Sequence, residues 1–187
     1  SPMPSQPGAP AISAETAAAS RKAAEWLLAQ GPVNFCIIRL ADGQTKQLRE
    51  KSPLPDQPFT VTYAGVNFIH PKPRDTDLTH LAGLSDLETL NLDVRDLQAA
   101  DLKHLKGSPK LKMISFSSPS SSDPLFESLS LWPELRSLFL RRTQVTKEGL
   151  ARIAPLQRLE ALMLHETRGM NDACLATLAK SSSLRQL

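Results

Sequence analysis

Residues 135–164 read LRSLFLRRTQVTKEGLARIAPLQRLEALML. Within this stretch the pattern apolar-x-x-apolar-x-apolar occurs twice, at Leu135-Leu138-Leu140 and, 24 residues later, at Leu159-Leu162-Leu164. Between the two copies lie Leu150 and Ile153, whose i, i+3 spacing is typical of one face of a short helix. The stretch therefore predicts a strand, a turn and a short helix that leads into the next strand.

The same unit recurs through most of the chain. Further copies begin at Tyr63, Leu87 and Leu111, and the motif starts again at Leu184, so the successive starts lie 24 residues apart and the last 25. The helical anchors recur in step at Leu78, Leu102, Phe126, Leu150 and Leu175, and again at Leu81, Leu105, Leu129, Ile153 and Leu178. One such unit cannot bury its apolar face alone, so the units are expected to stack into an α/β solenoid.

The first third of the chain has a different character. Residues 1–12 are proline-rich and predict a linker or an expression remnant. Residues 13–30 predict a helix that ends at Gly31-Pro32, residues 33–40 a strand, and residues 41–48 a tight turn with a return strand. Residues 13–62 are thus predicted to cap the repeats, which occupy residues 63–187 as five units and the start of a sixth.

Composition limits the class of protein. The chain has 187 residues, of which 41% are hydrophobic and 22% charged, so it is long enough for one folded domain and is not disordered throughout. No apolar run approaches the roughly 18 residues of a membrane span, and the first residues lack the pattern of a signal peptide. The net charge is +3, too mild by itself to indicate a nucleic-acid partner.

The unit at residues 135–158 carries Thr143, Val145, Thr146, Gly149 and Leu150 as T-x-V-T-x-x-G-L. With these motifs the chain resembles leucine-rich repeat proteins, whose repeats of roughly 20–29 residues carry LxxLxL on a strand, and in particular a bacterial subclass with this turn. Residues 117–123 depart from the turn pattern, and one residue is inserted at 170–172. The resemblance implies a curved parallel sheet with helices on its convex face and a binding role.

The segment AAEWLLAQGPV at residues 23–33 supports a second resemblance. Together with the following strand and hairpin, it resembles the segment that precedes such repeats in some membrane-anchored bacterial serine/threonine kinases. In those kinases the repeats lie outside the membrane, so this resemblance implies an extracytoplasmic location. The chain itself contains no kinase motif.

Side chains that alternate with the inward leucines are predicted to line the concave face of the sheet. On the first two repeats these residues are small, polar and slightly acidic: Gly65, Asn67 and Ile69, then Thr89, Asn91 and Asp93. On the later repeats the face gathers Met113, Phe139 and Met163, bordered by Arg141, His165 and Arg136. Apolar anchors with a basic rim suit a protein or peptide partner, although Phe139 and Met163 could instead simply pack on each other.

No residue set predicts catalysis, a cofactor or a metal. His80 and His104 share a repeat position that has Ser128 in the next unit, so a third metal ligand is missing. Cys36 and Cys174 are too far apart in the stack for an internal disulfide and are predicted to be buried. Residues 75–77 are better read as a helix cap than as part of a calcium loop, and residues 117–122 as a solvated loop.

The sequence therefore predicts a non-catalytic module that binds a protein or peptide. The alternative is self-association, or pairing with more repeats, through an uncapped C-terminal edge. Nucleic acid is not expected, and would require affinity to fall steeply with salt. Charge is uneven: residues 63–134 carry 7 minus 10, or −3, and residues 135–187 carry 9 minus 4, or +5. A charged partner is thus expected to bind toward the basic end.

Overall fold

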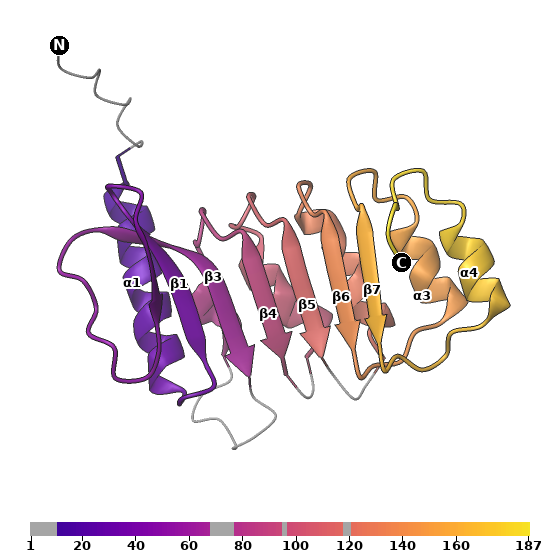
Figure 1. The fold of residues 1–187 in the computed structure, drawn as a ribbon, viewed down its shortest axis with the longest axis horizontal. Helices are drawn as coiled ribbons and strands as arrows, with labels where there is room; N and C mark the ends of the chain where they lie inside the picture. The colour runs from indigo at the N-terminus through magenta and orange to yellow at the C-terminus, as the bar shows by residue number, and fades with distance from the viewer. Residues whose placement is uncertain (1–10, 68–76, 95–96, 118–120) are drawn as a thin grey trace, which may run out of the picture.

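The computed structural model describes residues 11–67, 77–94, 97–117 and 121–187, and in these ranges seven strands form one sheet in the order β2-β1-β3-β4-β5-β6-β7 (Figure 1). The strands are β1 (Phe35–Leu40), β2 (Thr45–Leu48), β3 (Phe59–Asn67), β4 (Thr89–Asp93), β5 (Met113–Ser117), β6 (Ser137–Arg141) and β7 (Ala161–His165). Strand β1 is antiparallel to β2 and β3, whereas β3 to β7 are parallel neighbours. The protein is thus mixed α/β with a mostly parallel sheet.

Helical segments cover one face of this sheet and contact one another in chain order. They are α1 (Ala14–Ala29), η1 (Leu78–Leu81), α2 (Ala99–Leu102), η2 (Lys103–Leu105), η3 (Asp123–Leu131), α3 (Lys147–Ile153) and α4 (Asp172–Leu178). The predicted repeat helices therefore exist, but the first three are wholly or partly 3₁₀. No helix in the described ranges is both long enough and apolar enough to cross a membrane.

The 24-residue period of the sequence matches the pairing of neighbouring strands from β4 to β7, where paired residues lie 24 positions apart. Leu90, Ile114, Leu138 and Leu162 pair in succession across β4 to β7, and all four are 0% exposed. A row of apolar side chains at the same height in each strand forms a continuous core that no single unit could bury alone.

The register predicted for the first repeat is wrong. Val66 of β3 pairs with Leu92, and Ala64 pairs with Leu90, so this step is 26 residues rather than 24. The inward positions are Val61, Ala64 and Val66, all buried. Tyr63 does not start the motif, because its ring instead stacks on Phe35 with the ring centroids 4.8 Å apart. The predicted positions 68 and 69 lie outside the described residues.

Helix α1 lies at the N-terminal end of the helical layer, against β3 and η1. Ser13 caps the start of α1 by accepting a hydrogen bond from the Thr16 backbone N–H (3.2 Å). After the end of α1 the chain turns at Gly31, whose backbone is left-handed (φ +110°). The buried Ser20 hydroxyl of α1 accepts a hydrogen bond from the backbone N–H of Val61 (3.2 Å). The predicted strand starts two residues late, at Phe35, and Val33 is 44% exposed.

The start of helix α3 accounts for two residues of the T-x-V-T-x-x-G-L turn, Thr146 and Gly149. The Thr146 hydroxyl caps the helix by accepting from the Gly149 N–H (3.1 Å), and it donates to the Asp123 carboxylate (2.5 Å). A Cβ on Gly149 would lie 2.0 Å from Asp123 Oδ1. Glycine at this position therefore leaves room for a carboxylate from the previous repeat.

Leu175 was predicted to be a buried helical anchor, and this is wrong: it is 47% exposed. Leu150, its counterpart on α3, is 0% exposed, because α4 packs against α3. No described helix packs on the far side of α4. Cys174 and Leu178 remain buried there.

Candidate functional site

The strand register aligns three rows of side chains on the face of the sheet opposite the helical segments, which we call the helix-free face. The first row is Phe35, Gly65, Asn91, Ser115, Phe139 and Met163. The second is Ile37, Tyr63, Thr89, Met113, Ser137 and Ala161. The third is Asn67, Asp93, Ser117, Arg141 and His165.

Most of the predicted binding residues lie together on this face. Phe139 pairs directly with Met163 in the first row, and Met113 lies one row away on the neighbouring strand. All three are partly exposed, and we call them the Phe139 patch. In the third row Arg141 pairs with His165, and both side chains are exposed.

Arg136 lies apart from the other predicted residues. Arg136 directly precedes β6, whereas Arg141 is the last residue of that strand. The two arginines therefore lie at opposite ends of β6. The guanidinium of Arg136 pairs with the Glu160 carboxylate at 3.5 Å. Arg141, by contrast, forms no ion pair within the described part of the chain.

Arg142 was not predicted as part of this face. Its Nη2 lies 3.3 Å from Asp93 Oδ2 and 3.3 Å from the Ser117 hydroxyl, so it extends along the C-terminal ends of β4 and β5. The left-handed backbone of Arg142 (φ +49°) and of Glu166 (φ +52°) turns the chain after β6 and β7. No local sequence signal marks either residue, since neither is glycine or asparagine.

The part of the helix-free face formed by β1 and β3 carries aromatic residues. The sequence predicted these residues only as part of the cap or the core. The Phe35 ring stacks on Tyr63 at an interplanar angle of 19°, and the Arg49 guanidinium lies 4.9 Å from the Phe35 centroid. We call Arg49, Phe35 and Tyr63 the Phe35 stack. Its signal in the sequence is the alternation of Phe35 and Ile37 with buried Cys36 and Ile38.

The edge of the sheet where the strands begin is lined by paired charges. Glu88 Oε1 accepts from Arg39 Nη2 at 2.8 Å, and Glu88 Oε2 accepts from Lys112 Nζ at 3.0 Å. The hydrogen bond from Arg39, more than that from Lys112, holds the pKa of Glu88 below its ordinary value, against partial burial. Lys110 pairs with Asp86, and Arg158 with Glu134. These cations are already neutralised.

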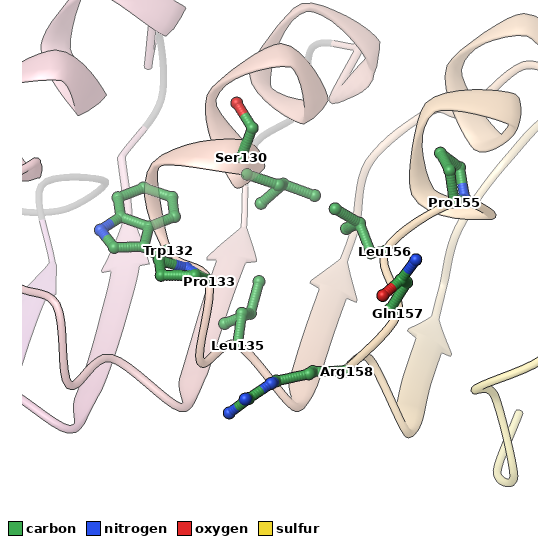
Figure 2. Close-up of a pocket in the computed structure, with 9 residues that line it drawn as sticks. Ser130, Trp132, Pro133, Leu135, Pro155, Leu156, Gln157 and Arg158 are labelled. Carbon is green, nitrogen blue, oxygen red and sulfur yellow. The ribbon is translucent and has the colours of Figure 1, made fainter.

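The described surface hollows lie away from the Phe139 patch. One of about 330 Å³ lies between the segment from η3 to β6 and the segment from α3 to β7, beside Trp132 and Leu156 (Figure 2). A second, of about 320 Å³, adjoins Leu175 and Leu187 at the C-terminal end, and a third, of about 540 Å³, adjoins the β1–β2 hairpin. None of these three hollows is lined by a residue of the Phe139 patch.

The histidine, aspartate and cysteine residues weighed as possible metal or disulfide sites contact other parts of the fold. His80 is half-buried and stacks on Trp26, with the ring centroids 5.3 Å apart. The Asp77 carboxylate caps η1 by accepting from the Thr79 N–H (2.9 Å), and this hydrogen bond lowers the Asp77 pKa. Both cysteines are free and buried, as predicted. Within the described ranges no three His, Cys, Asp or Glu side chains are grouped to hold a metal ion. Residues 70, 75, 76 and 118–120 lie outside those ranges.

Comparison with protein-family models finds no match, and comparison with curated proteins finds none. Among solved structures, the chain is similar to an internalin from Listeria monocytogenes, at 17% identity and a TM-score of 0.27. The similarity covers 61% of this chain and 50% of the internalin chain, so the protein spans about half the length of that neighbour. At so low a TM-score, the repeat architecture rests on the strand register of the chain itself.

Proposed function

We propose that the chain is a non-catalytic leucine-rich repeat solenoid, capped by α1 and the β1–β2 hairpin, that binds a protein or peptide on its helix-free face. The observation that carries this is the pairing of Phe139 with Met163 beside exposed Arg141 and His165. Partly exposed apolar side chains at the centre of a sheet face gain free energy when a partner removes them from water. The neighbouring exposed guanidinium of Arg141 adds charge selectivity.

The wider assignment follows the resemblance of residues 23–48 to the segment that precedes repeats in membrane-anchored bacterial kinases. On this proposal the module is the interaction region of a larger bacterial protein, with the repeats outside the cytoplasm. Labelling of Lys180, an exposed residue, by a membrane-impermeant amine reagent in intact cells tests the compartment. Reaction only after lysis would contradict it.

Selection from a displayed library of random dodecapeptides tests the binding function. Enriched peptides are synthesised and titrated against the native protein, against the double variant Phe139→Ser/Arg141→Glu, and against Lys180→Glu as a charge control in the turn that follows α4. We expect the double variant to lose roughly tenfold or more in affinity with little change in melting temperature, and Lys180→Glu to bind normally. Equal affinity for all three proteins would contradict the proposal.

The C-terminal end favours a second candidate, self-association. Leu175 and Leu187 are 47% and 61% exposed and border the same hollow. On the outer edge of β7, the described pairing is limited to the bridge between Ala161 and Gln186. A second copy could pair there along β7. Light scattering should then show a dimer that Leu175→Glu converts to monomer, and a concentration-independent monomer would contradict this candidate.

A further inference from the structure

The helix-free face extends beyond the repeats onto the hairpin. Phe35 and Ile37 of β1 occupy the same rows as Phe139 and Met113, because β1 pairs with β3 in register with the parallel strands. The face therefore has an apolar group at each end. Four strand-to-strand steps separate Phe35 from Phe139, or about 19 Å at about 4.8 Å a step.

The Phe35 stack packs closely over Gly65. A Cβ on Gly65 would lie 3.1 Å from ring atoms of both Phe35 and Tyr63, so the absence of that Cβ lets both rings lie over the backbone. The Arg49 guanidinium lies over the Phe35 ring, 4.9 Å from its centroid. A packed, ordered aromatic surface loses little conformational entropy when a partner binds.

The centre of the helix-free face, between the two apolar ends, is polar. Thr89, Asn91 and Ser115 lie here on β4 and β5, each partly exposed. Within the described ranges, their side chains form no hydrogen bonds with the protein. Hydroxyl and carboxamide groups in this state can serve the backbone N–H and C=O groups of a peptide laid across them.

The charges around the face divide into paired and unpaired cations. Arg39 and Lys112 are paired with Glu88, and Arg142 with Asp93. In the described part of the chain, Arg49 at one apolar end and Arg141 at the other have no carboxylate partner, and both are exposed. Each apolar end thus carries one cation available to a carboxylate of a ligand.

We propose that the face binds an extended acidic peptide with two apolar side chains about six residues apart. One apolar side chain contacts the Phe35 stack and the other the Phe139 patch, and a carboxylate beside each pairs with Arg49 or Arg141. The spacing follows from about 19 Å at about 3.3 Å per extended residue. This inference rests on the proposed function, to which it adds the chemistry and length of the partner.

The selected dodecapeptides provide the probe. We expect them to be net acidic and to share two apolar positions five to seven residues apart, a spacing of about 19 Å. Affinity should fall roughly fivefold or more in Arg49→Glu and in Tyr63→Ser. The matched control is Lys46→Glu. Lys46 is exposed on the same hairpin, but it pairs with the core residue Ile38 and so lies on the helical side of the sheet. This variant should bind the peptides normally.

A charge-reversed peptide sharpens the test. Replacing the acidic residue beside one apolar position with lysine should weaken binding to the native protein and restore it to Arg49→Glu. Arg49→Glu is an exposed change, so it keeps the test decisive even if Tyr63→Ser fails to fold. If Phe139→Ser/Arg141→Glu abolishes binding while Arg49→Glu and Tyr63→Ser leave it unchanged, the two-ended peptide is wrong and the proposed function stands. If none of these variants affects binding, both are wrong.

Discussion

The guanidinium of Arg142 lies 3.3 Å from the carboxylate of Asp93, 49 residues earlier in the chain. The contact spans β5, whose Ser117 hydroxyl lies 3.3 Å from the same nitrogen. Arg142 adopts φ +49° to leave β6, a conformation that costs an L-residue about 1 kcal/mol or more. One side chain therefore joins three repeats at the edge of the sheet where the parallel strands end, which also holds the exposed Arg141.

Substitutions at Arg142 should separate backbone strain from the ion pair. Arg142→Gly and Arg142→Ala both remove the ion pair, but only glycine relieves the left-handed φ. We expect the glycine variant to be more stable to urea than the alanine variant by about 1 kcal/mol. At Arg141, which lies in the strand, alanine should be the more stable of the two. Equal stabilities at position 142 would contradict the strain.

Gly149→Ala should destabilise the protein by about 2 kcal/mol in thermal or urea unfolding, because its Cβ would meet Asp123 Oδ1 at 2.0 Å. In an Asp123→Ala background the same change should be neutral or stabilising, since alanine favours a helix over glycine. The matched control is Gly107→Ala, where the nearest atom lies 3.4 Å away. A full penalty that persists in the Asp123→Ala background would refute this explanation.

Gly169→Ala should be the most harmful of these glycine substitutions. Its Cβ would lie 2.1 Å from the Val145 carbonyl oxygen, and its φ is +91°. Both obstacles belong to the backbone, so no side-chain change elsewhere relieves them. We expect a loss of several kcal/mol or failure to fold, read by circular dichroism, and native-like unfolding of this variant would contradict the close approach.

Glu88 should contribute stability that depends on pH. The hydrogen bond from Arg39, and then that from Lys112, lowers its folded pKa below the ordinary 4.5. A lowered carboxylate pKa stabilises the fold above pH 4.5, and this contribution disappears as pH falls through the folded pKa. Because all three side chains are 30–53% exposed, we expect Glu88→Gln to cost under about 1 kcal/mol at neutral pH.

The difference between native protein and Glu88→Gln should shrink toward zero at low pH in urea titrations. Glu160→Gln is the matched control at the equivalent position, since Glu160 has one cation partner, at 3.5 Å. A difference between native protein and Glu88→Gln that does not change with pH would mean that the carboxylate charge contributes nothing.

Cys36 should be unreactive while the protein is folded. Burial raises its pKa from 9.0 to about 12, so the reactive thiolate is scarce at neutral pH. A raised pKa gives stability that is present below pH 9 and lost as pH rises toward 12. A chromogenic disulfide should therefore modify Cys36 in the Cys174→Ala variant only after denaturation. The alkaline loss of stability should be smaller in Cys36→Ala, and rapid modification of the native fold would contradict this.

The repeat and most of its core could be predicted from the sequence. The spacing of Leu87, Leu111, Leu135 and Leu159 defines which side of each strand is apolar, and the pattern repeats often enough to fix the register from β4 to β7. The same alternation placed Phe139, Met163, Arg141 and His165 on one face. It could not place Arg136 with them, because residues that flank a strand have no fixed side.

The first register shows where the pattern was ambiguous. Both Tyr63-Val66-Phe68 and Val61-Ala64-Val66 fit apolar-x-x-apolar-x-apolar. Pairing of β3 with β1 and β4 selects the second and turns Tyr63 outward onto Phe35. The Phe35 stack could therefore not be placed at one end of a continuous face until that pairing was known.

The sequence by itself determined the 24-residue period, the presence of the secondary elements and the two sides of strands β4 to β7, because these depend on the local alternation of apolar and polar side chains. Only the tertiary structure decided which strand positions lie side by side, that Arg142 reaches Asp93, and that Arg49 and Arg141 have no carboxylate partner among the described residues. Those relationships depend on hydrogen bonds between strands that are far apart in the chain. The strand pairing must at the same time bury the apolar side chains and bring opposite charges on different strands together.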